Sequence, residues 1–535
     1  MKNVKKKYSL IIIAVVIALA LTQCAKRGSP TGGPVDETPP EILRAFPDNY
    51  SVNFKNQEIE ITFDEYVKLK DLQKQLVISP PLKYRPIIKP QGGASKKLTI
   101  EITDTLLDNT TYVLNFGQSI IDNTEENPYP FFKYVFSTGS YIDSLKIQGR
   151  VTDALKFKTD DFINVMLYEV NDSYTDSIIY NEVPRYVVNT LDSLTTFTME
   201  NLKAGQYRMV ALKEKSSNLK FDPKSDKLGF VSEVITVPTD EVFEVNLYEP
   251  EQNLELRRAS QVAQSRIQIG YEGLLDSAMI SPVNKSLIAA SRITKADKKD
   301  TLNYWYKPVL EQDSLELVVA LKEFKRTVTA RLKEQEKDSL IVSKYGQFSL
   351  RNPIQFTATT PIVKLSPLQM RLIDKDSVSQ DFAVKLDSLN NIWSYEFNVQ
   401  PENKYSLQSL PGAVTDFYGA TNDTITSVFT TKASSDLGNI PINLSGGTAF
   451  PIIVQIVTEN LEVTGEIIVR DNKSVTFDYL PPNKYYIRVI YDANDNGRFD
   501  PGNFLENRQP EKVVYFPDLI ALQANWDYVT NIILE

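Results

Sequence analysis

The chain has 535 residues, a net charge of −9 and 42% hydrophobic side chains, so its length predicts several domains with ordinary hydrophobic cores. It contains no histidine and one cysteine, which excludes Ser-His-Asp and Cys-His catalysis, zinc sites of histidine or thiolate, and disulfides within the folded domains. The acidic balance argues against nucleic acid as a partner.

The amino terminus has the composition of a secretion signal. Four of the first seven residues are lysine, residues 10–21 are apolar, and the one cysteine, Cys24, follows closely. This run is shorter than the about 20 residues that a spanning helix needs, so we predict a signal peptide at residues 1–23. The segment resembles a bacterial lipoprotein signal, which implies lipidation of the Cys24 thiol and anchoring in the outer membrane. An ordinary secretion signal with an incidental cysteine is the alternative.

Short alternating segments dominate the rest of the chain. Residues 24–38 are rich in Gly, Pro and small polar side chains, which predicts a flexible tether. Period-two alternation in segments such as 58–63 and 111–116 predicts half-buried strands. Amphipathic helix is expected only near residues 254–264 and 330–337. We therefore predict an all-β fold of tandem antiparallel β-sandwich domains with only short helices.

Two segments, 202–223 and 480–501, align without a gap at an offset of 278 residues. Tyr207 matches Tyr485, and in each copy a strand and a leucine-containing turn precede the tyrosine. This order resembles the transthyretin-like modules that are also seen as carboxypeptidase-regulatory domains. The resemblance implies transthyretin-like β-sandwiches at residues 140–249 and 435–535, the second with an Asx-rich loop.

A second repeat is weaker. Tyr112 precedes Phe136 by 24 residues, and Tyr405 precedes Phe429 by the same distance. The first copy resembles the bacterial Ig-like domain of envelope and surface-layer proteins, which implies such a domain at residues 39–139 and a degenerate one at 346–434. Residues 250–345 then form an intervening β-rich domain. Signal, tether and paired modules together resemble the Ig-like-domain lipoproteins of Bacteroidota outer membranes.

The sharpest chemical motif lies in residues 492–500, where oxygen donors occupy relative positions one, three, five and nine and glycine occupies position six. Calcium-binding loops have this pattern, with a backbone carbonyl at position seven. Position twelve is Asn503 rather than the expected glutamate. The alternative is a hairpin loop in which Asp and Asn side chains cap backbone amides. The candidate ligands of a structural calcium ion are Asp492, Asn494, Asn496, Arg498 and Asp500.

The tripeptide Asp-Ser/Thr-apolar recurs along the chain more often than composition predicts. It is similar to the O-glycosylation acceptor of exported Bacteroidota proteins, which implies a surface glycan on the hydroxyl. The alternative is an Asx turn at the start of a strand. The candidate acceptors are Thr105, Ser144, Ser177, Ser193, Ser277, Thr301, Ser314, Ser339, Ser377, Ser388 and Thr424.

These observations predict a protein that is not an enzyme. Adjacent carboxylates such as those at residues 64–65 point to opposite faces of a strand and do not form a glycosidase site by themselves. We expect a lipid-anchored outer-membrane protein that acts as a binding or scaffold protein with envelope proteins as partners, either as an adhesin-like spacer or as an accessory subunit of an outer-membrane complex. The alternative is a glycan-binding or adhesin-like surface protein with an aromatic platform near Trp305, Trp393 or Trp526. A carboxylate-based polysaccharide-active enzyme ranks third. The sequence predicts neither the periplasmic nor the cell-surface face of the outer membrane over the other.

Overall fold

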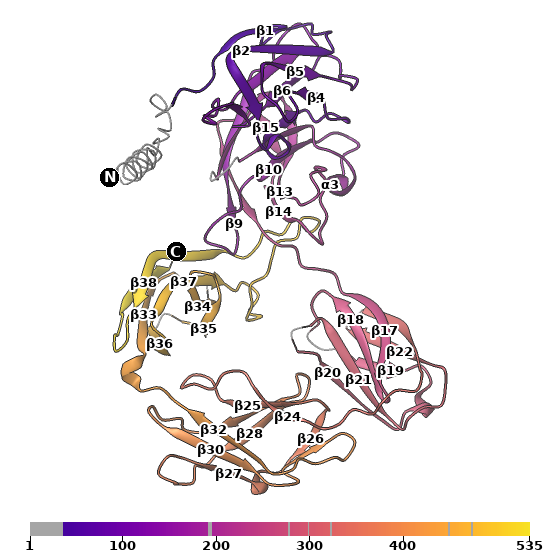
Figure 1. The fold of residues 1–535 in the computed structure, drawn as a ribbon, viewed down its shortest axis with the longest axis vertical. Coiled ribbons are helices and arrows are strands. Elements are labelled where there is room, and N and C mark those ends of the chain that lie inside the picture. Colours follow the sequence, from indigo (N-terminus) through magenta and orange to yellow (C-terminus); the bar gives the residue numbers. More distant parts are fainter. Residues whose placement is uncertain are drawn as a thin grey trace, which may run out of the picture. The chain divides into compact units, whose positions relative to one another are not determined.

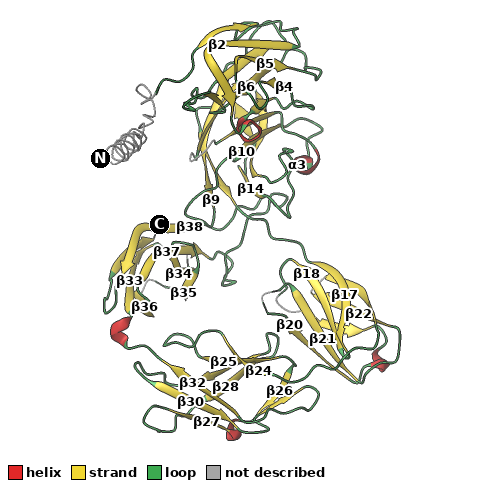
Figure 2. Cartoon of the chain, in the orientation of Figure 1, coloured by secondary structure: helices red, strands yellow, loops and turns green. Residues whose placement is uncertain are grey.

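Strands make up most of the folded chain (Figures 1 and 2). The computed structural model describes residues 36–190, 195–275, 279–297, 299–321, 324–447, 450–471 and 474–534. The first compact unit extends to Ile142 without Ser79–Pro81, and the second comprises Ser79–Pro81 and the chain from Asp143 onward. The first unit contains one β-sandwich core and the second contains four. The predicted all-β fold of tandem sandwiches is confirmed.

The helices of the described residues are single turns. They are α2 (Leu72–Gln75), α3 (Ile178–Asn181) and the 3-10 turns η1 (Lys285–Leu287), η2 (Pro367–Gln369) and η3 (Ser434–Asp436). Within the described ranges, no helix has the length and apolar character required to cross a bilayer.

The first sandwich packs two sheets around one core. One sheet consists, in spatial order, of β1 (Ile42–Phe46), β2 (Glu58–Leu69), β5 (Ser95–Glu101) and β4 (Ile87–Lys89), with β7 (Ile120–Asp122) beside β2. The other consists of β3 (Val77–Ser79), β6 (Thr111–Asn115) and β8 (Lys133–Ser137). The buried Tyr112 hydroxyl accepts a hydrogen bond from the Leu107 amide at 2.9 Å. The Asp122 carboxylate accepts four backbone amides from residues 124–127. These bonds fix the loops that connect the sheets.

The second and fifth sandwiches have the same topology. The second contains β11 (Tyr186–Asn189), β10 (Asn164–Glu169), β13 (Gly205–Lys213), β14 (Lys227–Phe230) and β15 (Ile235–Val237), opposite β12 (Thr196–Leu202), β9 (Leu145–Asp153) and β16 (Val242–Leu247). The fifth contains β35 (Val463–Val469), β34 (Ile452–Thr458), β37 (Asn483–Tyr491) and β38 (Val513–Leu522), opposite β36 (Ser474–Leu480), β33 (Gly438–Gly446) and β39 (Thr530–Leu534). Each has one parallel pair, β9 with β16 and β33 with β39. The sequence pattern does not distinguish these parallel pairs from antiparallel ones.

Residues related by the 278-residue offset make equivalent bonds in these two sandwiches. The Tyr207 hydroxyl donates to the Lys203 carbonyl at 3.1 Å, and the Tyr485 hydroxyl donates to the Pro481 carbonyl at 2.8 Å. The backbone has a positive φ at Asn201 and at Tyr479, directly before the leucine that the two copies share. Both tyrosines therefore tie the start of a central strand to the turn that precedes it.

The third and fourth sandwiches complete the second unit. The third contains β17 (Glu255–Ala263), β18 (Arg266–Glu272), β21 (Thr301–Lys307) and β20 (Ala290–Lys295), opposite β19 (Met279–Pro282), β22 (Ser314–Leu321) and β23 (Phe324–Arg331). The fourth contains β24 (Val342–Tyr345), β25 (Ile354–Ala358), β29 (Ile392–Glu396) and β28 (Ala383–Asp387), opposite β27 (Met370–Ile373), β30 (Lys404–Ser409) and β32 (Ile425–Thr430), with β26 (Ile362–Leu365) paired to β31 (Val414–Asp416).

The fourth sandwich repeats the loop bonds of the first. The Tyr405 hydroxyl accepts from the Gln400 amide at 2.7 Å, as Tyr112 does from Leu107. Asp416 ends a three-residue strand and accepts backbone amides from the following loop, as Asp122 does. The second sequence repeat thus corresponds to a repeated set of loop-fixing side chains.

Both helices expected from the sequence are wrong. Residues 255–263 form strand β17, whose register against β18 shifts at two places, between Leu256 and Ala259 and between Gln261 and Ala263. Each bulge adds a residue, so the inward-facing positions are spaced irregularly and imitate a helical period. The second expected helix begins inside β23, and residues 332–341 are irregular because their backbone bonds to other segments, as when the Gln264 amide donates to the Glu336 carbonyl at 2.9 Å.

The second and fifth sandwiches dock against each other. Arg208, on β13, is 5% exposed, and its guanidinium lies over the rings of Phe230 and Phe504 at 5.5 Å and 5.2 Å. It also donates to the Asn507 side chain at 2.7 Å. Phe157 stacks on Tyr486 with ring centroids 5.3 Å apart. We call this contact the docking interface; it joins residues that are about 300 positions apart in the sequence.

Exchange of residues across the first repeat provides a test of local backbone strain. Tyr479 has φ 56° and the equivalent Asn201 has φ 60°. Because Asn tolerates the left-handed region better than Tyr, Tyr479→Asn should raise the free energy of unfolding by about 0.5 kcal/mol. The reverse change, Asn201→Tyr, should lower it, also because Asn201 donates to the Asp143 carbonyl at 2.8 Å. Denaturant unfolding of both variants checks this, and equal effects of the two changes would contradict it.

Phe504→Ala should release the docking interface. Phe504 is 3% exposed and packs edge-on against Phe230, so its removal should cost about 3 kcal/mol of docking free energy. Hydrogen exchange at residues 500–509 should then accelerate about a hundredfold, while the core of the first sandwich keeps its protection. The matched control is Leu505→Ala, since that side chain is 57% exposed. Unchanged exchange in Phe504→Ala would contradict the interface.

Candidate functional site

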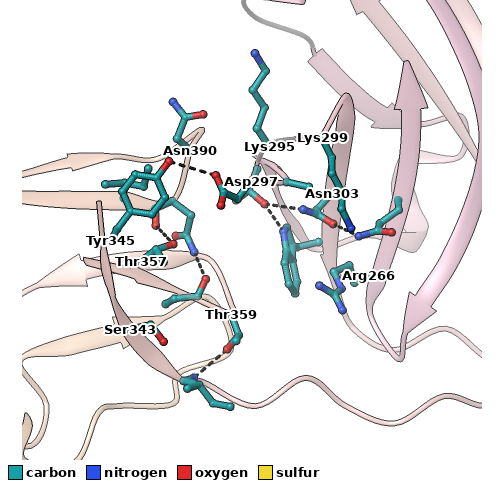
Figure 3. Close-up of a pocket in the computed structure, with 18 of the residues that line it drawn as sticks. Arg266, Lys295, Asp297, Lys299, Asn303, Ser343, Tyr345, Thr357, Thr359 and Asn390 are labelled. Atoms are coloured by element: carbon teal, nitrogen blue, oxygen red, sulfur yellow. Dashed lines mark hydrogen bonds between the residues drawn. The ribbon is translucent and has the colours of Figure 1, made fainter. Parts of the chain in front are cut away.

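A cavity of about 680 Å³ lies between the third and fourth sandwiches of the second unit. Figure 3 shows Arg266, Lys295 and Asn303 on the side of the third sandwich and Ser343 and Tyr345 on the side of the fourth. Most of its lining side chains carry hydroxyl, amide or charged groups. This volume is within the range of small-molecule sites. We call it the inter-sandwich cavity.

The wall from the third sandwich is the outward face of one sheet. Gln268, Asn303 and Thr294 face one another across β18, β21 and β20, as their registers require. Gln268 Nε2 donates to Asn303 Oδ1 at 3.0 Å, and Asn303 Nδ2 donates to Thr294 Oγ1 at 3.4 Å. Asn303 is 6% exposed, so this amide is a buried polar group at a cavity wall. The hydrogen bonds hold its orientation.

Trp305 lies in the next row of the same face. Its indole nitrogen donates to Thr294 Oγ1 at 2.9 Å, and the Arg266 guanidinium lies 4.9 Å from the ring centroid. Tyr418 of the fourth sandwich packs edge-on against it at 6.5 Å. Trp305 is only 2% exposed, so it supports the wall and offers no ring face to a ligand.

Arg266 connects this wall to a second, smaller cavity of about 250 Å³, which Asp338 and Tyr418 line. Its guanidinium pairs with Asp338 at 3.0 Å. Burial raises the pKa of the Asp338 carboxyl, and the charge of Arg266 opposes that rise. The ion pair therefore holds Arg266 between the two cavities.

The wall from the fourth sandwich comes from β24, β25 and the turn before β29. Thr357 Oγ1 donates to the Asn391 carbonyl at 3.0 Å, and the buried Asn391 side chain bonds to the backbone of its own sandwich. The Tyr345 hydroxyl spans the cavity and donates to Asp297 at 3.2 Å (Figure 3). Burial raises the pKa of Tyr345, and Asp297 raises it further. The Lys295 amide also donates to the Leu389 carbonyl at 2.7 Å.

The arrangement is suited to binding. Asp297 and Asp300 are the carboxylates that line the cavity, and both are exposed on the same loop. The Tyr345 hydroxyl donates to the Asp297 carboxylate and ties the two walls together, and the Thr357 hydroxyl donates to a backbone carbonyl. Sequence reasoning missed the cavity because its residues come from strands of two sandwiches, where outward polar positions resemble an ordinary solvated surface.

Of the sequence-predicted site residues, Cys24 lies outside the described residues. So do Ser193 and Ser277 of the proposed glycan acceptors. The other acceptors sit in loops or at strand starts, where all are exposed except the half-buried Thr301. Asx turns occur at some of them, as when Asp387 accepts the amides of Leu389 and Asn390. Both readings of the tripeptide therefore stay open.

The structure brings most of the predicted calcium ligands together in one loop. Asp492 accepts the amides of Asn496 and Gly497 at 3.0 and 2.8 Å. The side-chain amides of Asn494 and Asn496 both donate to the Asp500 carboxylate. The Arg498 side chain lies 3.5 Å from that carboxylate. If each of the two side-chain amides rotated by a half-turn, its oxygen instead of its nitrogen would lie beside Asp500, as the binding of a cation requires.

Glu511 is a member of this loop cluster that the sequence pattern did not identify. It accepts the amides of Ala493 and Asp500 at 2.8 and 3.1 Å. Burial raises its pKa, the two amides oppose the rise, and the charges of Asp500 and Asp492 add to it. In the described part of the chain, no three acidic side chains are grouped closely enough to hold a metal. Structural calcium stays a prediction.

Of the three tryptophans named for an aromatic platform, Trp305 and Trp393 are buried and Trp526 is exposed. Trp393 is 1% exposed and packs on Phe356 in the fourth core. Trp526 is 50% exposed in the fifth sandwich. Of the three tryptophans, only Trp526 thus offers an exposed ring to a ligand that binds by stacking.

Asp492→Ala tests whether the loop is stabilised by hydrogen bonds or by metal. Asp492 is 1% exposed, and loss of its carboxylate leaves two partly buried amides without their acceptor, so the free energy of unfolding should fall by about 1 kcal/mol. Thermal unfolding in EDTA measures this effect, with the exposed Asp471→Ala as control. A calcium-dependent rise in the wild-type midpoint that Asp492→Ala abolishes would establish the metal, while equal midpoints with and without calcium would contradict it.

Comparison with known proteins identifies one domain. No curated protein sequence matches the chain. Among solved structures, domains 1–6 of the surface layer protein SbsC align with 10% identity over 91% of this chain and 68% of theirs, at a TM-score of 0.16. The Bacillus anthracis TIE protein aligns with 9% identity over 94% and 75%, at 0.14. The Bacteroides ovatus mixed-linkage glucan utilization locus protein SGBP-B aligns with 12% identity over 70% and 91%, at 0.16. Such scores do not establish a shared overall architecture.

Residues 36–138 match the family model of the bacterial Ig-like domain, which confirms the resemblance of the first sandwich to that family.

Proposed function

We propose that the protein is a lipid-anchored, non-catalytic scaffold of the outer membrane that serves as an accessory subunit of an envelope protein complex. The docking interface carries this proposal. It holds the second and fifth sandwiches in one fixed relation, through Arg208 and through the Tyr515 hydroxyl, which donates to the Leu155 carbonyl at 2.7 Å. A chain that orders its own domains in this way can present a surface of defined geometry to a partner, which a loose spacer cannot do.

The anchor in this proposal is the lipid on Cys24, with residues 24–38 as the tether. Two acyl chains or more give the stable membrane attachment that a single chain lacks. Glycans on the exposed acceptors would increase the solubility of the scaffold, and calcium at residues 492–500 would stiffen its last sandwich. Protease treatment of intact cells distinguishes the periplasmic face from the cell-surface face.

Binding of a glycan is the second candidate function, and the inter-sandwich cavity favours it. Its walls present amide and hydroxyl groups from two sheets, such as Asn303 and Tyr345. These are the groups that pair with the hydroxyls of a sugar.

Cys24→Ser should move the protein from the outer-membrane fraction to a soluble fraction without changing its fold, because only the anchor is lost. Fractionation, with circular dichroism of the purified variant, measures both effects. Ser29→Ala, in the same segment, is the matched control. Normal membrane levels of Cys24→Ser would contradict the anchor.

Affinity purification of the wild type from detergent-solubilised membranes tests the accessory-subunit role. We expect an envelope protein in stoichiometric amount, and its loss in Phe504→Ala, which releases the docking interface. Recovery of the chain without any stoichiometric protein would contradict this role.

A further inference from the structure

We propose that the inter-sandwich cavity binds a short segment of a neutral oligosaccharide, held by side chains of both the third and the fourth sandwich. This inference deepens the glycan-binding candidate and rests on it, but it does not depend on the lipid anchor or on a protein partner. Its basis is the chemistry and the placement of the cavity walls.

The walls of the cavity offer both hydrogen-bond donors and hydrogen-bond acceptors. Gln268 and Asn390 are amides, Ser343 and Tyr345 are hydroxyls, and Asp300 is a carboxylate. Sugar hydroxyls are both donors and acceptors, so they can pair with all of these groups, whereas an ion pairs with only one sign of charge. Within the described residues, no side-chain hydrogen bond of the fold engages the Ser343 hydroxyl, which leaves it available to a ligand.

The charges in the cavity argue for a neutral ligand. Lys295, Lys299 and Arg266 are cationic, and Asp297 and Asp300 lie on the same loop as Lys299. Arg266 is already neutralised by Asp338 at 3.0 Å. A phosphate or a carboxylate would meet the two aspartates as it approached the lysines, so the cavity is poorly suited to anions.

The walls also argue against a peptide. Both are faces of sheets, and the backbone groups behind Gln268, Asn303 and Thr357 are already paired in their ladders. Strand addition, the usual way to recognise an extended peptide, would have to use β20 or β24, the edge strands at the cavity, and in β20 the Lys295 amide is already bonded to the Leu389 carbonyl. Apolar lining side chains are few, with Ile341 and Ile392 the largest aliphatic ones, so a peptide side chain would find no apolar pocket.

The ligand would bridge the two sandwiches. The Tyr345 hydroxyl and Asp297 already span the cavity at 3.2 Å (Figure 3), and the Lys295 amide donates to the Leu389 carbonyl at 2.7 Å. These contacts hold the walls at a fixed distance before a ligand arrives. Such preorganisation lowers the entropic cost of binding. Because Trp305 is buried, this ring does not stack on the ligand, and the polar side chains of the walls supply the contacts.

The test is isothermal titration calorimetry of the full chain in detergent. The probes are hexasaccharides derived from cellulose, xylan, starch, mannan, mixed-linkage glucan and polygalacturonate, the last being anionic. A pool of hexapeptides and inorganic phosphate are the comparison probes. Ser343→Tyr fills the cavity from an exposed position of β24, and Asn390→Ala removes a wall amide from an exposed turn. Thr426→Tyr, exposed on β32 of the opposite sheet, is the matched control.

We expect at least one neutral hexasaccharide to bind with a Kd of about 1 mM or lower. Ser343→Tyr should weaken that binding at least about tenfold, Asn390→Ala by about threefold, and Thr426→Tyr should leave it unchanged. Equal melting temperatures of the variants establish that each has folded.

Three results would overturn the inference. They are the absence of binding by every neutral hexasaccharide up to about 10 mM, binding that Ser343→Tyr does not weaken, and stronger Ser343-dependent binding of the hexapeptides, polygalacturonate or phosphate. None of them concerns membrane fractionation or the protein partner, so failure here is distinguishable from failure of the scaffold role.

Discussion

The burial of Arg208 between two aromatic rings is the central contact between the second and fifth sandwiches. The guanidinium packs on Phe230 of its own sandwich and on Phe504 of the fifth, and donates to the Ser232 carbonyl at 2.5 Å. Arg488 makes the reciprocal contact, since it is 6% exposed and donates to the Leu155 carbonyl of the second sandwich at 3.3 Å. Aromatic faces and carbonyl oxygens compensate each buried charge without a carboxylate. A pair of buried arginines, one from each repeat, thus holds the two sandwiches together without a disulfide.

Much of the fold could be predicted from the sequence, because strand alternation and the two repeats are local signals. Tyr207 and Tyr485 align at a fixed offset, and they make the same bond to the preceding turn. The helix expected at residues 254–264 was wrong because bulges in β17 imitate a helical spacing. The docking interface could not be predicted at all, since Arg208 and Phe504 carry no signal of their proximity until the fold brings them together.

The candidate site shows the same limit more strongly. Asn303 and Thr294 alternate with core residues on their strands, and this alternation predicts a face that is exposed to solvent. Their burial, at 6% and 3% exposed, depends on neighbouring strands and on the fourth sandwich. The Asx-rich loop was identified from its spacing, because its ligand candidates are close in sequence, but Glu511 comes from the far side of the hairpin and lies outside the motif. A local sequence motif can therefore predict a loop, whereas a cavity between two domains can be found only once the fold is known.

The parallel pairing of β9 with β16 has a mechanical consequence. The chain enters the second sandwich at Leu145 along β9 and leaves it at Leu247 along β16, and the two strands run side by side in register from Gln148 to Asp153. Tension between the amino-terminal side of the chain and its later domains would therefore act along these strands, in shear. In that geometry the ladder bonds share the load and must break together, whereas a hairpin pulled from its ends opens one bond at a time. The sandwich that carries Arg208 is thus built to transmit force along the chain without opening.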